Sequence, residues 1–176
     1  MAKVKKQEKD DVYWLVFTTV LNLEFKFGHQ RWTISQLSRS SGISRPLIYY
    51  YFGKSKPQIV LEAVRILGDV IAGLPDKNIE MWKTGHLVEE VLETRQLLAK
   101  APNMIAFYFS RRNDTNEIGN AIRAIETKFM KKLSDFFPDM PRPQLEGFFA
   151  VFIGLTFSLN ISDDAVKAII DAVFKT

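Results

Sequence analysis

Apolar residues recur at helical spacing between residues 10 and 27. Intervals of three and four residues place one set of them on a single helical face: Val12, Leu15, Val16, Val20, Leu23 and Phe27. Gly28 follows this run and readily adopts a backbone conformation that ends a helix. The pattern predicts a first amphipathic helix over residues 10–27, preceded by a basic tail over residues 1–9.

The next segment begins with the residues of a capping box. In Thr33-Ile34-Ser35-Gln36, the threonine oxygen and the glutamine side chain reciprocally satisfy free backbone donors at a helix start. We therefore expect a short second helix from about residue 34 to residue 40, with Ile34 and Leu37 buried.

Three consecutive tyrosines at positions 49–51 have an ambiguous local preference, because tyrosine favours strands on propensity and its ring also serves as a stacking surface. The preceding residues decide the question. Gly42 suits the left-handed end of a helix, and Ser44 is a good N-cap. Pro46 lies in the first turn, where its missing N–H has no intrahelical partner to lose. These signals predict a tight turn and a third helix that carries the tyrosines.

The remainder of the chain is also predicted to be helical. The run IVLEAVRILGDVIAGLP, which begins at Ile59, indicates a fourth helix closed by Gly73-Leu74-Pro75. Five further helices are expected at residues 84–100, 102–111, 117–137, 143–160 and 163–174. Because no segment alternates convincingly with a period of two, the predicted fold class is all-α.

Composition indicates the cellular context. The 176 residues are 47% hydrophobic and include no cysteine, which excludes disulfides, thiolate metal sites and cysteine nucleophiles. The N-terminal residues lack a secretory pattern, and the longest uncharged stretch, Gly147–Ser162, is shorter than the ~20 residues of a membrane helix. We expect a cytoplasmic protein without a membrane partner.

Charge is unevenly distributed along the chain. Residues 1–60 contain ten lysines or arginines and four acids, whereas residues 61–176 contain 14 basic and 16 acidic residues. Such asymmetry suggests an anionic polymer or surface as the partner of the first 60 residues. A basic disordered tail with ordinary charge scatter is the alternative explanation.

The second and third predicted helices have the features of a helix-turn-helix, whose second helix enters the DNA major groove. An ordinary helical hairpin is the alternative. Successive helical residues are rotated by ~100°, so the three tyrosines cannot share one environment. The residues expected to pack on the first helix are Ile43, Ile48, Tyr51 and Phe52. Those expected to face outward are Arg45, Pro46, Tyr49 and Tyr50.

The outward-facing side chains match the two kinds of DNA contact. Arg45 is the best candidate for reading guanine, because its guanidinium donates two parallel hydrogen bonds. Tyr49 and Tyr50 present hydroxyls to phosphates and rings to sugars or base edges. The sequence therefore predicts a double-stranded DNA partner.

Residues 21–59 resemble the DNA-binding region of TetR-type bacterial transcriptional regulators. That family has a glycine ending helix one, a threonine opening helix two, then small-Gly-hydrophobic-Ser, then Leu/Ile-Tyr-x-Tyr/His-Phe and a lysine. Gly28, Thr33, Ser41-Gly42-Ile43-Ser44 and Ile48-Tyr49-Tyr50-Tyr51-Phe52 occupy these places, and the spacing from Gly28 to Gly42 agrees. The resemblance covers about 40 of the 176 residues.

The resemblance implies a homodimer on a roughly palindromic operator, usually a repressor released by a small ligand. Thr33, Tyr49 and a lysine at the start of helix four would contact phosphates, and Arg45, Pro46 and Tyr50 would lie nearest the bases. In FGKSKPQI the spacing is one residue longer than the usual Phe-x-x-Lys, which leaves Lys54 and Lys56 as alternatives for the lysine. Leu47 stands where a small or polar residue is common and suits an apolar contact. Together with Ser44, these residues are the predicted DNA-binding set.

Small residues recur along one side of the helix expected at 143–160. Gly147, Ala150, Gly154 and Ser158 would let a second helix approach closely. With the apolar face of the last helix, they suggest a four-helix dimer interface; packing within one chain is the alternative. The predicted interface residues are Gly147, Ala150, Val151, Gly154, Ser158, Val166, Ile169, Ile170 and Val173.

Aromatic residues are dense in the C-terminal two thirds of the chain and are compatible with a cavity for a flat or apolar ligand. The predicted pocket residues are Trp82, Met104, Tyr108 and Phe152, with a plain aromatic core as the alternative. The chain would then consist of a DNA-binding domain, residues 1–56, and a regulatory and dimerisation domain, residues 57–176. A second hypothesis replaces the small ligand by a protein partner.

The sequence contains no recognisable set of catalytic residues. The only histidines are His29 and His86, and no phosphate-binding glycine loop or metal-spaced cluster accompanies them. Asp163-Asp164 lies at a predicted helix start, where acidic residues complement the helix dipole. We therefore expect no enzymatic activity, no metal and no cofactor.

Overall fold

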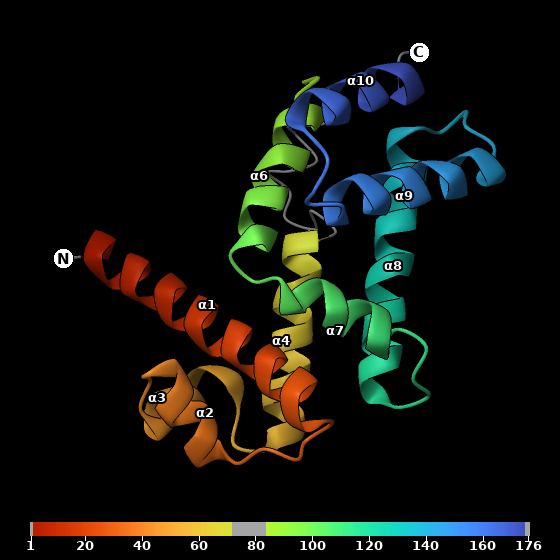
Figure 1. Cartoon of the computed structure of the whole chain (residues 1–176). Helices are drawn as coiled ribbons and strands as arrows, with labels where there is room; N and C mark the ends of the chain where they lie inside the picture. The colour runs from red at the N-terminus through yellow and green to blue at the C-terminus, as the bar shows by residue number, and fades with distance from the viewer. Residues whose placement is uncertain (1, 72–83, 175–176) are drawn as a thin grey trace. The chain divides into compact units, whose positions relative to one another are not determined.

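The computed structural model describes residues 2–71 and 84–174, and this part of the chain is helical without a strand (Figure 1). The helices are α1 (Ala2–Phe27), α2 (Ile34–Ser41), α3 (Arg45–Phe52), α4 (Lys56–Ile71), α6 (Leu87–Ala99), α7 (Asn103–Arg111), α8 (Glu117–Phe136), α9 (Arg142–Phe157) and α10 (Asp163–Phe174). The all-α prediction is confirmed. The predicted closure of the fourth helix at residues 73–75 lies outside the described residues.

The first helix differs from its prediction at its start and on its buried face. It begins at Ala2, so the segment predicted as a basic tail is helical. Its buried residues include Phe17, Leu21 and Glu24, whereas Leu15 is 46% exposed. Leu15 lies about 140° around the helix from the buried Val20, which takes it off the packed face. Val16, Val20 and Leu23 of the predicted face are buried as expected, and the buried Glu24 lies beside them.

Contacts divide the chain into two compact units. The first comprises Met1–Leu67 and Ala101–Ile122, and the second comprises Gly68–Lys100 and Arg123–Thr176. The helices α4 and α8 each contribute residues to both units. By contacts, α7 and the start of α8 belong to the unit that contains α1–α3. The predicted functional boundary between residues 56 and 57 stays a prediction.

In the first unit, α1 packs against both α2 and α7. Asn103 at the start of α7 donates a hydrogen bond of 2.8 Å to Asn22 of α1. The largest fully buried side chains of this unit include Trp32, Phe17, Phe107, Leu21, Leu37, Ile48 and Ile59. A shared apolar core therefore fixes α2 and α3 against α1.

In the second unit, α6 packs against α9 and α10. Its core contains Val91, Phe129, Leu133, Leu145, Phe148, Phe152, Leu155, Val166 and Ile170. Arg95 of α6 is also buried, and its guanidinium donates to the backbone oxygens of Leu155 at 2.6 Å, Ser158 at 2.7 Å and Ile161 at 2.7 Å. This arginine satisfies carbonyl groups at the end of α9 that the helix itself leaves without donors.

Candidate nucleic-acid interface

The start of α2 forms the predicted capping box. The Gln36 amide N–H donates to Thr33 Oγ1 at 3.2 Å, and the Thr33 amide N–H donates to Gln36 Oε1 at 2.7 Å. Leu37 is fully buried and Ile34 is half-buried. The cap fixes the first turn of α2 and leaves Thr33 exposed at its end.

The turn between α2 and α3 is held by glycine and by two serines. Gly42 has a φ of 71°, in the left-handed region that a glycine adopts without strain. Ser38 Oγ donates to the Ile43 carbonyl at 2.7 Å, and Ser41 Oγ donates to the Leu37 carbonyl at 2.8 Å. Three residues therefore suffice to connect the two helices, as the sequence predicted.

The third helix separates an inner from an outer face. Ile48 and Phe52 are buried, whereas Tyr50 is 78% exposed. Arg45 and Pro46 are also exposed at the start of the helix. The prediction that the tyrosines lie on a helix is confirmed, and so is the outward position of Arg45, Pro46 and Tyr50. The other predicted DNA-binding residues of this segment are exposed (Ser44) or half-buried (Leu47 and Tyr49).

Tyr51 packs on the first helix, as predicted, and lies at the edge of the core. It is half-buried, and its ring centroid is 5.2 Å from that of Tyr13 on α1 and 4.8 Å from that of Tyr50. The Lys9 ammonium lies 5.9 Å from the Tyr51 ring centroid and 5.4 Å from that of Tyr13. Packing on the first helix is as expected. The large ring cannot be enclosed completely, because α1 covers only one side of this short helix.

Arg45 is oriented by the second helix. Its Nη2 donates to the Ser35 hydroxyl at 2.7 Å, although both residues lie at the surface of their helices. A guanidinium has five N–H donors, so this contact leaves several of them available for other acceptors. Sequence reasoning did not find the role of Ser35, because the contact depends on the angle between α2 and α3.

The two candidate lysines have different environments. Lys56 Nζ is half-buried and donates to the backbone oxygens of Gln30 at 2.7 Å and Trp32 at 3.2 Å, in the loop between α1 and α2. Lys54 is exposed, and within the described part of the chain its one hydrogen bond runs from the backbone N–H to Gln58 Oε1 at 3.0 Å. Lys56 therefore has a structural task in the folded chain, while the Lys54 ammonium is available to an external anion.

A buried carboxylate organises the loop that leads into α2. Glu24 is 0% exposed and accepts hydrogen bonds from the Trp32 indole N–H at 2.6 Å and from the Gln30 amide N–H at 2.9 Å. Its other oxygen lies 3.0 Å from His29 Nδ1. Glu24 lies one turn after the buried Val20, but an acidic residue is not counted as core in an apolar pattern. This cluster positions the start of the helix pair.

The predicted pocket residues are distributed over both units. Met104 and Tyr108 are buried on α7 in the first unit. Phe152 is buried in the second unit, where its ring packs against Phe129 with centroids 4.9 Å apart. Trp82 lies outside the described residues. The structure therefore describes these three side chains as core residues, and their role in a ligand pocket stays a prediction.

The predicted dimer surface is open in part. Gly147, Ala150 and Gly154 are exposed on α9, and a Cβ added at either glycine would meet no atom within 4 Å. On α10, Ile169 and Val173 are 38% and 46% exposed. The remaining residues of this surface are half-buried (Val151 and Ser158) or covered by the core of their own unit (Val166 and Ile170). The last two were misassigned to an open face because α10 also packs on α6.

No protein-family model, curated protein or solved structure matches the chain. The resemblance to TetR-type regulators is therefore carried by the residues from Leu21 to Ile59 alone. Over residues 2–71 and 84–174, no group of three or more histidines and carboxylates is arranged to hold a metal ion. None of the described helices combines the length and apolar character needed to cross a bilayer.

Proposed function

We propose that this chain is a transcriptional regulator of the TetR type that binds operator DNA through α2 and α3. The observation that supports this most is the outer face of α3. It presents Arg45, Pro46 and Tyr50 to solvent while Ile48 and Phe52 anchor the helix in the core. A short, rigidly held helix with a basic and aromatic outer face suits insertion into a major groove.

Phosphate contacts would flank this helix. Thr33 stands exposed at the start of α2, where a helix N-terminus favours an anion, and Lys54 follows α3 with an exposed ammonium. The Tyr49 hydroxyl would donate a further hydrogen bond to a phosphate. Contacts to phosphates fix the position of the protein along the DNA, whereas contacts to base edges provide the sequence preference. The excess of basic residues in positions 1–60 supports this arrangement.

We further propose that two copies associate through the open surface of α9 and α10. Gly147, Ala150 and Gly154 permit close helix approach, and Ile169 and Val173 supply exposed apolar area. A two-fold dimer recognises a palindromic operator whose half-sites lie ~34–36 Å apart, one DNA turn. A small apolar or aromatic effector would release the DNA if it bound more tightly to a dimer whose two α3 helices have a different spacing. The loss of DNA affinity would then equal the difference between the effector's affinities for the two forms of the dimer.

The role of Arg45 is tested by a pair of variants. Arg45→Ala is expected to weaken binding to the preferred operator by ~1–3 kcal/mol and to relax preference at particular base pairs, because a bidentate guanine contact is lost. Ser35→Ala removes only the hydroxyl that orients the guanidinium and should retain the preference. Fluorescence anisotropy with operator and scrambled duplexes measures both. An unchanged preference in Arg45→Ala contradicts the assignment.

Variants of the two lysines should have different effects: one on DNA binding and the other on the stability of the fold. Lys54→Met is expected to weaken all DNA sequences alike and to reduce the salt dependence by about one phosphate contact, with stability changed by less than ~0.5 kcal/mol. Lys56→Met leaves two loop carbonyls without their donor and should lower the free energy of unfolding by ~1–3 kcal/mol. Salt titrations of DNA binding and urea unfolding measure the two quantities. If Lys56 were the phosphate contact instead, Lys56→Met would reduce the salt dependence of DNA binding and Lys54→Met would not.

A further inference from the structure

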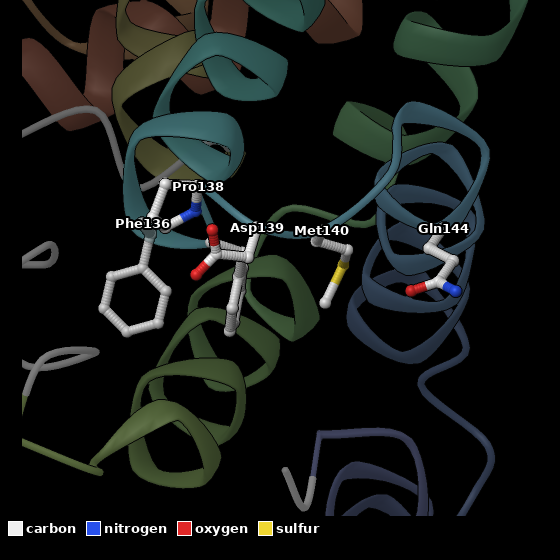
Figure 2. Close-up of a pocket in the computed structure, with 6 residues that line it drawn as sticks. Phe136, Pro138, Asp139, Met140 and Gln144 are labelled. Atoms are coloured by element: carbon white, nitrogen blue, oxygen red, sulfur yellow. The ribbon is translucent and has the colours of Figure 1, made fainter.

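The turn between α8 and α9, in the second unit, borders a cavity of about 330 Å³ (Figure 2). The residues that line it are Phe136, Phe137, Pro138, Asp139, Met140 and Gln144. Figure 2 shows Phe136 at the end of α8, Pro138, Asp139 and Met140 in the following turn, and Gln144 in the first turn of α9. None of these residues belongs to the predicted DNA-binding, dimer or pocket sets.

The apolar wall of the cavity is held in place by the core behind it. The rings of Phe136 and Phe137 meet edge to face with centroids 4.5 Å apart, and the Phe137 ring lies 5.2 Å from that of the buried Phe148. Phe136, Phe137 and Met140 are half-buried and pack against the core cluster of the second unit. A ligand would therefore meet a preformed aromatic surface and pay little conformational entropy to order it.

Among the described residues that line the cavity, Asp139 is the charged one. Its carboxylate is exposed and has no hydrogen bond or ion pair within the described part of the chain. The acids on either side differ: Asp135 is paired with Lys131 at 2.6 Å, and Glu146 is paired with Arg142 at 3.0 Å. Over residues 2–71 and 84–174, the Asp139 carboxylate therefore gives the cavity a negative charge that has no paired cation.

We propose that this cavity binds a small organic cation with a flat apolar body. The carboxylate attracts the cationic group, and the aromatic faces and the Met140 thioether interact well with a cation and with an apolar ring. The Gln144 amide supplies both a donor and an acceptor to orient polar substituents. A volume near the lower end of the ~300–1,000 Å³ of ligand pockets suits one or two fused rings. Binding here does not depend on the chain being a DNA-binding regulator.

Three naphthyl probes of similar size and different charge test the charge requirement by calorimetry with the full chain: 2-naphthylmethylammonium, 2-naphthylmethanol and 2-naphthoate. We expect the cation to bind about three- to fivefold more tightly than the alcohol, because an exposed ion pair contributes up to ~1 kcal/mol. The naphthoate should bind most weakly. Asp139→Asn should abolish the preference for the cation while retaining the alcohol. Asp135→Asn, which removes a nearby carboxylate outside the cavity, should leave the preference unchanged.

The location is tested separately by NMR of ¹³C-methyl methionine. A naphthyl ring in the cavity should shift the Met140 methyl resonance and leave that of the buried Met104 of the first unit unmoved. Equal affinity for the three probes, a cation preference that survives in Asp139→Asn, or an unmoved Met140 signal at saturation would each overturn the proposal.

Discussion

Replacing Arg95 by methionine is expected to lower the free energy of unfolding by ~3–5 kcal/mol. Arg95 is 6% exposed, and its guanidinium donates to three backbone carbonyls at the end of α9 and in the following turn. Methionine fills a similar volume but donates no hydrogen bond. The Leu155 carbonyl would then be buried, and the Ser158 and Ile161 carbonyls part-buried, without the charged donor that satisfies them.

Urea unfolding measures this loss, with two variants as controls. Arg95→Lys keeps the charge but cannot reach three carbonyls with a fork of donors, so its cost should be intermediate. Arg142→Met removes an exposed arginine paired with Glu146 at 3.0 Å and should cost less than ~1 kcal/mol. A loss in Arg95→Met no larger than that in Arg142→Met would contradict the assigned role of the buried guanidinium.

Glu24→Leu is expected to destabilise the first unit by a similar amount, ~3–5 kcal/mol. The Trp32 indole N–H and the Gln30 amide N–H would lose the carboxylate oxygen that accepts both of them at 2.6 and 2.9 Å. Because this cluster lies directly before α2, the variant should also weaken DNA binding on all sequences.

Glu24→Gln is the matched control for the same site. The glutamine oxygen can continue to accept from Trp32 and Gln30, and its amide N–H can donate to His29 Nδ1 when the imidazole proton is on Nε2. We expect a loss below ~1.5 kcal/mol, because two neutral hydrogen bonds replace charge-assisted ones. Urea unfolding and near-ultraviolet circular dichroism of the tryptophans provide the comparison. Equal losses in the leucine and glutamine variants would show that the hydrogen bonds are not what Glu24 contributes.

The sequence predicted the helices because their signals are local. The capping box of Thr33 and Gln36, the left-handed Gly42 and the early Pro46 act within four residues, and each lies in the structure where the pattern placed it. The division of α3 into inner and outer faces followed from helical rotation. Tyr51 packs on α1 as predicted but is only half-buried, since periodicity gives the direction of a side chain and not how much of it a neighbouring helix covers.

The interactions that hold the loops could not be predicted in this way. Lys56 bonds to carbonyls 24 and 26 residues away, and Arg95 to carbonyls 60 to 66 residues away. Their partners are backbone oxygens, which have no signature in the residue type. Glu24 was overlooked for a related reason, because hydrophobic patterns exclude a charged residue whose partners become known only after folding. The cavity at Asp139 likewise depends on how α9 turns back after α8.

In-vitro selection of bound duplexes from a random DNA pool tests the central claim most directly. The proposed function predicts enrichment of a palindrome with half-sites about one helical turn apart, and loss of the preference at specific base pairs when the selection is repeated with Arg45→Ala. A pool that shows no enriched sequence, or an enriched site that Arg45→Ala selects equally well, would contradict sequence-specific recognition through α3.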